Sequence, residues 1–220
     1  MHVKRLCFNM MDQNTYVVSD DSGECVIIDC GCSDDTEQKQ LADYIERNNL
    51  QVKHLLCTHF HLDHTFGNKF ALEKFNLQAE VNEGDRILAE MIHYQAVAFG
   101  LSDDQIDIPA PIYTLSDGAE ISFGNTKLTV ITTPGHSPGS VSLYSQQDGI
   151  LFSGDTIFKG AFGAVNLPGG RLPKLYRSIT QKIFTLPEET VIYPGHGEST
   201  LVGVEKETNP ILFVDGVKKD

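Results

Sequence analysis

Three histidines and one aspartate fall within six consecutive residues of this chain, in the pattern H-x-H-x-D-H: His59, His61, Asp63 and His64. Imidazole and carboxylate groups are ligands that zinc, iron and manganese accept, and these six residues hold no thiolate that would favour a soft metal. In a purely structural role, four such groups at the end of an apolar strand would be costly to desolvate or would repel one another. The pattern therefore predicts a metal site.

Three further candidate ligands each follow a predicted apolar strand and lie in a glycine-containing loop. They are His136 in Pro-Gly-His-Ser, Asp155 in Ser-Gly-Asp and His196 in Pro-Gly-His-Gly. Loops at one edge of a sheet can converge, and they commonly carry function. Each residue alone is a weak signal, but together with the run at 59–64 the three indicate one shared site.

The elements that must position these residues form two similar halves, each with strands followed by a helix. In the first half we expect two hairpin strands, a helix, a buried strand and a second helix, at 14–18, 25–29, 36–48, 54–58 and 67–75. In the second half we expect a helix that starts at Pro173 and five strands, at 119–123, 128–131, 140–144, 149–152 and 190–193. The pattern predicts one α/β domain over residues 1–220, with two sheets sandwiched between helices.

Two local expectations concern the predicted metal run and its surroundings. If the chain stays extended at His59 and His61, their side chains point the same way, and the chain must then turn for Asp63 and His64 to join them. A helical stretch at about 84–99 is expected to cover the core or the site. We interpret His93 within it as a satisfied or solvated side chain rather than a ligand.

Composition and charge limit the function classes. The chain has 220 residues, 40% hydrophobic and 21% charged, which is ordinary for a soluble globular domain with a sizeable core. Its formal net charge of −13 argues against nucleic acid as a partner, because phosphate binding depends on clustered Lys and Arg. No apolar run reaches the roughly 18 residues of a membrane span, and the N-terminus lacks a signal-peptide pattern, so we expect no membrane association and a cytoplasmic protein. The sequence predicts no particular oligomeric state.

The cysteines are expected to be free thiols rather than a disulfide framework. Their number is odd and no secretory context accompanies them, at positions Cys7, Cys25, Cys30, Cys32 and Cys57. We interpret the Cys30-Gly31-Cys32 pair as small residues in a turn after a strand, because no second pair is present to complete a zinc tetrahedron.

The order of the seven candidate ligands resembles that of the metallo-β-lactamase-fold hydrolases over nearly the whole chain. Within them the chain is most similar to the glyoxalase II-like (hydroxyacylglutathione hydrolase-like) branch, on the segments 132–140, 154–160, 193–200 and 205–210. The resemblance implies a four-layer αβ/βα sandwich and two divalent metal ions, zinc being the first choice and iron or manganese the alternatives. It also implies three ligands for each ion and one bridging carboxylate: His59, His61 and His136; Asp63, His64 and His196; and Asp155 between them.

Two divalent ions that share a carboxylate can lower the pKa of a water molecule toward neutrality, so that hydroxide can attack a carbonyl carbon. A thioester suits such a site, since a thiolate leaving group with a pKa of about 8.5 needs little help from a general acid. Asp63 is expected to accept a proton late in turnover, in addition to being a ligand. We therefore expect a dinuclear metal-dependent hydrolase of a thioester, such as a hydroxyacylglutathione, or of a related small ester.

Glutathione recognition is less well supported by the resemblance than hydrolysis is. Full-length glyoxalase II proteins carry an added C-terminal helical region with glutathione-binding basic residues, and we expect this chain to lack it. Where many relatives read Gly-Arg-x-Asp, this chain has Gly163-Ala164-Val165-Asn166.

A basic stretch nevertheless favours a small anionic substrate. Between Asp155 and Glu188 the chain has no acidic residue, but it has five basic ones. Lys159 and Arg171 are expected to contact the substrate. The other three, Lys174, Arg177 and Lys182, are expected on the solvated face of the last helix.

Other functions of the same fold stay as alternatives. The persulfide dioxygenases resemble this fold but hold one iron with two His and one Asp, and they usually end in Tyr-Pro-Ala-His-Asp where this chain has Tyr-Pro-Gly-His-Gly at 193–197. A non-catalytic module often loses ligands that this chain retains. The β-lactam hydrolases commonly place a cysteine where Asp155 stands.

Overall fold

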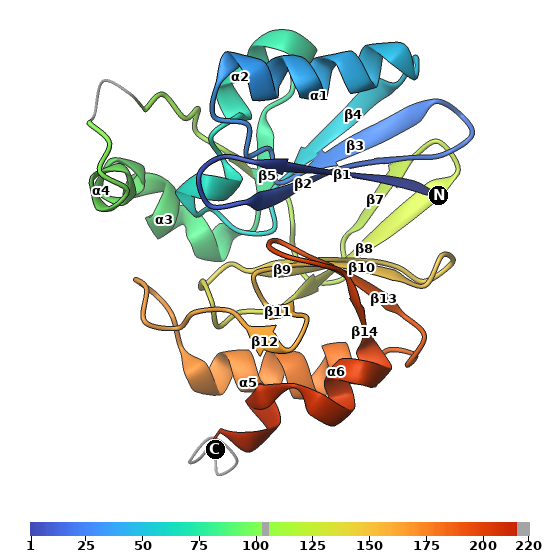
Figure 1. Cartoon of the computed structure of the whole chain (residues 1–220), viewed down its shortest axis with the longest axis vertical. Helices are drawn as coiled ribbons and strands as arrows, with labels where there is room; N and C mark the ends of the chain where they lie inside the picture. Colours follow the sequence, from blue (N-terminus) through green and yellow to red (C-terminus); the bar gives the residue numbers. More distant parts are fainter. Residues whose placement is uncertain (103–105, 215–220) are drawn as a thin grey trace.

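Two six-stranded sheets lie face to face in the computed structural model, which describes residues 1–102 and 106–214 (Figure 1). The first sheet consists, in spatial order, of β1 (His2–Phe8), β2 (Gln13–Ser19), β3 (Glu24–Ile28), β4 (Gln51–Leu56), β5 (Ala79–Val81) and β6 (Ile112–Tyr113). Its first three strands pair antiparallel, and β3 to β6 run parallel. The predicted hairpin around residue 22 is confirmed, whereas β1 was not predicted.

The second sheet carries the ends from which three candidate ligands emerge. In spatial order it consists of β14 (Thr200–Leu201), β13 (Val191–Pro194), β10 (Ile150–Gly154), β9 (Val141–Ser145), β8 (Thr126–Thr132) and β7 (Glu120–Phe123). Strand β9 is antiparallel to both β8 and β10, and β13 is parallel to β10. The strands β8, β10 and β13 therefore all end at the same edge of the sheet.

Helices cover the outer faces of both sheets, as the sequence predicts. In Figure 1, α1 (Asp35–Arg47) and α2 (Asn68–Phe75) lie over the first sheet, and α5 (Leu172–Gln181) and α6 (Val202–Thr208) lie under the second. Helix α1 starts after Asp34, whose side chain accepts hydrogen bonds from two first-turn backbone N–H groups. Helix α5 has Pro173 in its first turn, as predicted. No helix in the described part of the chain is long and apolar enough to cross a membrane.

Three apolar layers hold these elements together. The layer between the two sheets includes fully buried side chains from both of them, among them Val26, Leu56, Phe123 and Phe152. Separate clusters lie between each sheet and its helices. All five cysteines are free, and the four at positions 25, 30, 32 and 57 are buried. The expectation of free thiols is confirmed.

The helix expected at 84–99 is interrupted, which corrects the prediction of one continuous stretch. A 3₁₀ turn at Glu83–Asp85 leads into α3 (Arg86–Glu90), and α4 (Ile92–Ala98) follows after Met91. The amide of Gln95 donates to the Leu88 carbonyl at 3.0 Å, the group that would accept from residue 92 in a continuous helix. The Leu88 carbonyl also accepts from the Met91 N–H at 3.2 Å, so both of its bonds at the break differ from those of a continuous helix.

A partly buried pair on neighbouring strands should make stability depend on pH. His54 Nδ1 on β4 lies 2.6 Å from Glu80 Oε1 on β5. This hydrogen bond raises the pKa of His54 above its ordinary 6.5, although burial and Lys53 act to lower it. Burial would raise the pKa of Glu80, but hydrogen bonds from His54 and Thr114 hold it below its ordinary 4.5. The stabilisation from His54 is complete below pH 6.5 and is lost as pH rises through its folded pKa; that from Glu80 is lost as pH falls below 4.5.

We expect His54→Gln to lower the free energy of unfolding by about 1 kcal/mol near pH 6, with the difference shrinking by pH 9. Urea denaturation of both proteins at the two pH values measures this. His2→Gln is the control, because the His2–Asp21 pair is largely exposed at both ends, 69% and 95%. A His54→Gln difference that is equal at pH 6 and pH 9 would contradict the prediction.

Candidate metal centre

The seven predicted ligands converge at one edge of the two sheets. His136 follows β8, Asp155 follows β10 and His196 follows β13, which end together as described above. The run at 59–64 follows β4 in the first sheet, whose end faces the same place. The sequence pattern of a polar residue after an apolar strand thus located all four parts of the site.

The local path of the run differs from the prediction in one respect. Strand β4 ends at Leu56, two residues before the predicted end at 58. The Thr58 N–H donates to Asp29 Oδ1 at 2.6 Å instead of to a neighbouring strand, so the ladder cannot continue. The expected turn is present, as a 3₁₀ turn over Leu62–His64. His59 and His61 therefore reach the site from a loop rather than from alternating strand positions.

The ligand atoms form two groups, each with its members within 4.8 Å of one another: His59, His61 and His136; and Asp63, His64 and His196. In the first, His136 Nε2 lies 2.9 Å from His61 Nδ1 and 3.2 Å from His59 Nε2. In the second, Asp63 Oδ2 lies 3.2 Å from His196 Nε2 and 3.5 Å from His64 Nε2.

Asp155 stands between the two groups. Its Oδ2 lies 3.6 Å from His136 Nε2 of the first group and 3.6 Å from His196 Nε2 of the second, and its Oδ1 lies 3.4 Å from His64 Nε2. One carboxylate thus presents oxygens to both groups, which is the position of a bridging ligand.

The donor set fits divalent cations. His64 Nε2, His61 Nε2 and Asp155 Oδ1 are buried and have no hydrogen-bond partner. Buried polar atoms are normally satisfied, so a cation between His64 and Asp155 would supply what the protein does not. Nitrogen and carboxylate oxygen are also the donors that zinc, iron and manganese accept. The residues present fit two ions that share Asp155.

Four of the histidine rings are fixed from behind by a second hydrogen bond through Nδ1. His64 Nδ1 lies 2.9 Å from Asp29 Oδ2, and His59 Nδ1 lies 3.1 Å from Thr58 Oγ1. The Nδ1 atoms of His136 and His196 lie 2.8 Å and 3.0 Å from the backbone carbonyls of residues 164 and 11. Such partners set which ring nitrogen faces the site and hold the ring in place.

The electrostatics of the site differ from one candidate ligand to another. Burial, with help from the neighbouring histidines, lowers the pKa of His59 well below its usual value and that of His61 to about 3. Burial alone would raise the pKa of Asp155, but His64 and the other nearby histidines hold it below its ordinary value. Burial would also lower the pKa of His64 and His196, but the neighbouring carboxylates hold both above the ordinary 6.5. Neutral imidazole and ionised carboxylate are the forms that bind a metal, so these two rings release a proton when a metal binds.

Asp29 is a buried residue of the site that the sequence reasoning missed. It forms a third compact group with His59 and His64. Its oxygens, however, already accept hydrogen bonds from Thr58 N, Thr58 Oγ1 and the His64 ring at 2.6, 2.7 and 2.9 Å. We therefore describe Asp29 as positioning His64 and the run. It follows an apolar strand, Val-Ile-Ile-Asp at 26–29, which is the same signal that located the other candidates.

Asp85 is a second missed residue, and it joins two ligand loops. Its carboxylate is fully buried and accepts from Phe60 N at 2.9 Å, between His59 and His61 in the chain. It also accepts from Ser137 Oγ at 2.9 Å and Gly139 N at 2.6 Å, just after His136. No local pattern marks it, because its partners are distant in sequence.

We expect Asp85→Asn to lower the free energy of unfolding by about 2 kcal/mol. One carboxylate oxygen would become an NH₂ group, which is a donor, so the N–H of either Phe60 or Gly139 would lose its acceptor. Metal affinity should fall about 10- to 100-fold, as for other residues that orient ligands. Urea denaturation and metal titration measure the two effects. The control is Asp34→Asn, because asparagine caps a helix as well as aspartate does. Unchanged stability in Asp85→Asn would overturn this role.

A cavity of about 480 Å³ opens onto five of the ligands, His61, Asp63, His136, Asp155 and His196. We call it the site cavity. The rest of its wall comes from Met11, Leu88, Met91, Tyr94, Gln95, Ala98, Phe99, Phe158, Ala164, Leu167 and Pro168. Helices α3 and α4 thus cover the site, as expected of the stretch at 84–99. His93 on α4 is exposed and belongs to none of the ligand groups.

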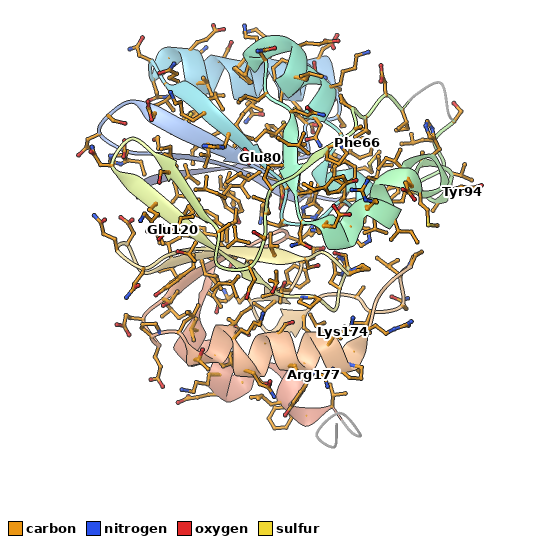
Figure 2. The ribbon with its side chains drawn as sticks, turned by 180° about the vertical axis from the view of Figure 1, so that it is seen from behind. Phe66, Glu80, Tyr94, Glu120, Lys174 and Arg177 are labelled. Atoms are coloured by element: carbon orange, nitrogen blue, oxygen red, sulfur yellow. The ribbon has the colours of Figure 1, made fainter. Side chains whose placement is uncertain are left out.

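The five basic residues between Asp155 and Glu188 lie outside the wall of the site cavity. Lys159 forms an exposed ion pair with Glu198 at 2.6 Å, one residue beyond the wall residue Phe158. Arg171 is exposed just before α5. Figure 2 shows Lys174 and Arg177 on α5. Lys182 is not merely solvated, since it donates to Thr132 O at 2.7 Å.

Comparisons with known proteins agree with this geometry. Residues 10–196 match the sequence model of the Metallo-beta-lactamase superfamily. Hydroxyacylglutathione hydrolase GloC of Haemophilus influenzae is 30% identical over 213 residues, which are 96% of this chain and 98% of that protein.

Two solved structures are similar over almost their whole length. BLEG-1 B3 metallo-beta-lactamase has a TM-score of 0.82 at 30% identity, covering 97% of this chain and 100% of that one. TTHA1623 in a di-iron-bound form has a TM-score of 0.81 at 33% identity, covering 96% and 100%. The match at residues 10–196 includes all seven candidate ligands, so the resemblance inferred from the motifs is confirmed. The chain belongs to the metallo-β-lactamase superfamily.

Proposed function

We propose that the protein is a dinuclear metal-dependent hydrolase of thioesters. The observation that carries the proposal is the position of Asp155, whose two oxygens face histidines of both ligand groups within 3.6 Å. His59, His61 and His136 would hold one ion, and Asp63, His64 and His196 the other. When bound, two such ions supply a water molecule of lowered pKa and a Lewis acid for a carbonyl oxygen.

The protein's own groups divide the remaining work. Asp63 faces the site cavity and lies 3.2 Å from His196, so its carboxylate can accept the proton that remains on the attacking hydroxide late in turnover, as the thiolate leaves. Among the described residues of the wall, the ligands are the only acidic or histidine side chains. A leaving group that needs no protonation therefore fits best, and a thiolate with a pKa of about 8.5 meets this condition better than an alkoxide or an amine.

The relatives support the same chemistry in coarser terms. GloC of Haemophilus influenzae is named a hydroxyacylglutathione hydrolase, and TTHA1623 holds two irons. We propose zinc as the bound metal, with iron or manganese as the alternatives. We further propose a small-molecule substrate whose thiol part is anionic and lies near Lys159 and Arg171. The proposal also includes a cytoplasmic location and no nucleic-acid partner, given the net charge of −13.

The purified protein tests the proposal through metal content and thioester cleavage measured on one sample. We expect two metal ions per chain and hydrolysis of S-D-lactoylglutathione or another small thioester, lost on chelation and restored by added zinc or iron. A single iron per chain with sulfite formed from glutathione persulfide would replace this proposal with an oxygenase. Two ions without cleavage of any thioester would show that the substrate class is wrong.

A further inference from the structure

The wall of the site cavity carries no cationic side chain among the residues that the structure describes. Beyond the five ligands, its eleven residues are apolar or aromatic except for Gln95. Gln95 is already engaged: its Oε1 accepts from Leu62 N at 3.0 Å, and its amide donates to Phe60 O at 3.2 Å and Leu88 O at 3.0 Å. The Tyr94 hydroxyl is then the only polar group of the wall that is not a ligand or already bonded within the protein.

We propose that the site cavity receives the acyl chain of the substrate and that this chain is uncharged and apolar. The inference rests on the proposed thioesterase function and specifies its substrate class. The five ligands that line the cavity fix where the carbonyl must lie, and the acyl chain extends from there along the rest of the wall. A carboxylate on that chain would lose its hydration without meeting a Lys or Arg, which is costly. An alkyl or aryl group would instead remove apolar wall surface from water.

The size and rim of the cavity agree with such a substrate. Its volume of about 480 Å³ lies within the range of small-molecule sites. Three wall residues are also large and exposed at the surface: Met11 at 47%, Tyr94 at 74% and Leu167 at 42%. Figure 2 shows Tyr94 on α4 at the outer edge of the molecule. Scattered exposed apolar residues need no explanation, but three around one cavity mark a binding site.

A charged thiol part does not conflict with an apolar acyl chain. Lys159 and Arg171 lie outside the cavity, one position from Phe158 and three from Pro168 along the chain. The substrate therefore divides at its carbonyl, with the apolar half inside the cavity and the polar half toward solvent.

A series of N-acetylcysteamine thioesters tests the inference, because the uncharged leaving group stays constant. We expect kcat/KM to rise about three- to fourfold per methylene from acetyl to hexanoyl, which corresponds to about 0.8 kcal/mol per methylene. Hexanoyl should exceed adipoyl, its counterpart of equal length with a terminal carboxylate, at least about 100-fold. A readout without catalysis is calorimetric binding of the two matching thioethers to metal-free protein, in which the hexyl compound should bind at least tenfold more tightly.

A pair of variants locates the effect in the cavity. Leu167→Lys places a cation at the wall, and we expect it to lower the hexanoyl-to-adipoyl ratio at least tenfold. Leu201→Lys is the matched control, because Leu201 is equally exposed at 40% but lies on β14 outside the wall. It should leave the ratio unchanged.

The outcomes separate the inference from the function beneath it. If thioesters are cleaved but adipoyl equals or exceeds hexanoyl, or acetyl is as good as hexanoyl, the inference is wrong and the hydrolase stands. If no thioester is cleaved, the proposed function is wrong, and the thioether binding decides whether the cavity prefers apolar chains. Equal binding of the two thioethers would overturn the inference in either case.

Discussion

Replacing Asp155 by asparagine is expected to lower kcat/KM for a thioester at least about a thousandfold, or roughly 4 kcal/mol of transition-state stabilisation. The variant keeps the size of the side chain but removes the negative charge between the two ligand groups. One of the two oxygens that face His64, His136 and His196 at 3.4–3.6 Å becomes an NH₂ group, which cannot bind a cation. Metal analysis after dialysis should show fewer than two ions per chain.

The control for Asp155→Asn is Asp43→Asn, which removes an aspartate whose ion pairs with Lys39 and Arg47 lie on the surface of α1. We expect wild-type metal content and activity from it, because exposed ion pairs contribute little. Asp155→Asn with two tightly bound ions and activity within tenfold of wild type would show that Asp155 does not bridge the site.

The candidate ligands could be located from the sequence because each follows a short apolar strand, a pattern that is visible locally. The run at 59–64 and the residues 136, 155 and 196 all have this form. Once several strands of a sheet end at one edge, the polar residues that follow them meet there. The two-sheet architecture was predicted for the same reason, since alternating strands and helices in two halves are visible locally.

What the sequence did not provide depends on contacts between distant segments. Asp85 accepts hydrogen bonds from the loops at 60 and 137–139, and no sequence pattern near position 85 predicts those partners. At the break at Met91 the Gln95 side chain bonds to the Leu88 carbonyl, a contact that no helical periodicity predicts. Strand β1 buries only Leu6 and Phe8, so its apolar signal is weak.

The chemistry of the cavity wall was likewise outside the reach of local patterns. The basic residues after Asp155 suggested an anionic substrate, but the fold turns Lys159 toward Glu198 and leaves it exposed. The wall is assembled instead from apolar side chains near positions 11, 88–99 and 158–168. Contact of Lys159 and Arg171 with the substrate stays a prediction, and it would concern the part of the substrate that lies outside the cavity.

Replacing Gly195 by alanine is expected to lower metal affinity and hydrolysis at least about 100-fold through a single added methyl group. A Cβ at this position would overlap Asp155 Oδ1 and would lie 2.7 Å from His64 Cε1. The backbone cannot yield easily, because Gly195 N donates to Gly154 O at 2.8 Å and Gly195 O accepts from Asn14 N at 2.7 Å. The two ligands must therefore move, and metal titration with the steady-state kinetics of the same samples measures the result.

Gly197→Ala separates this overlap from a general effect of alanine in the same loop. Gly197 has φ +76°, so alanine there is strained by about 1 kcal/mol, but its Cβ would meet nothing within 4 Å. We expect Gly197→Ala to lower stability while it keeps both metals, and Gly195→Ala to lose metal even where it remains folded. If the two variants bind metal equally well, the packing of Gly195 against Asp155 and His64 does not control the site.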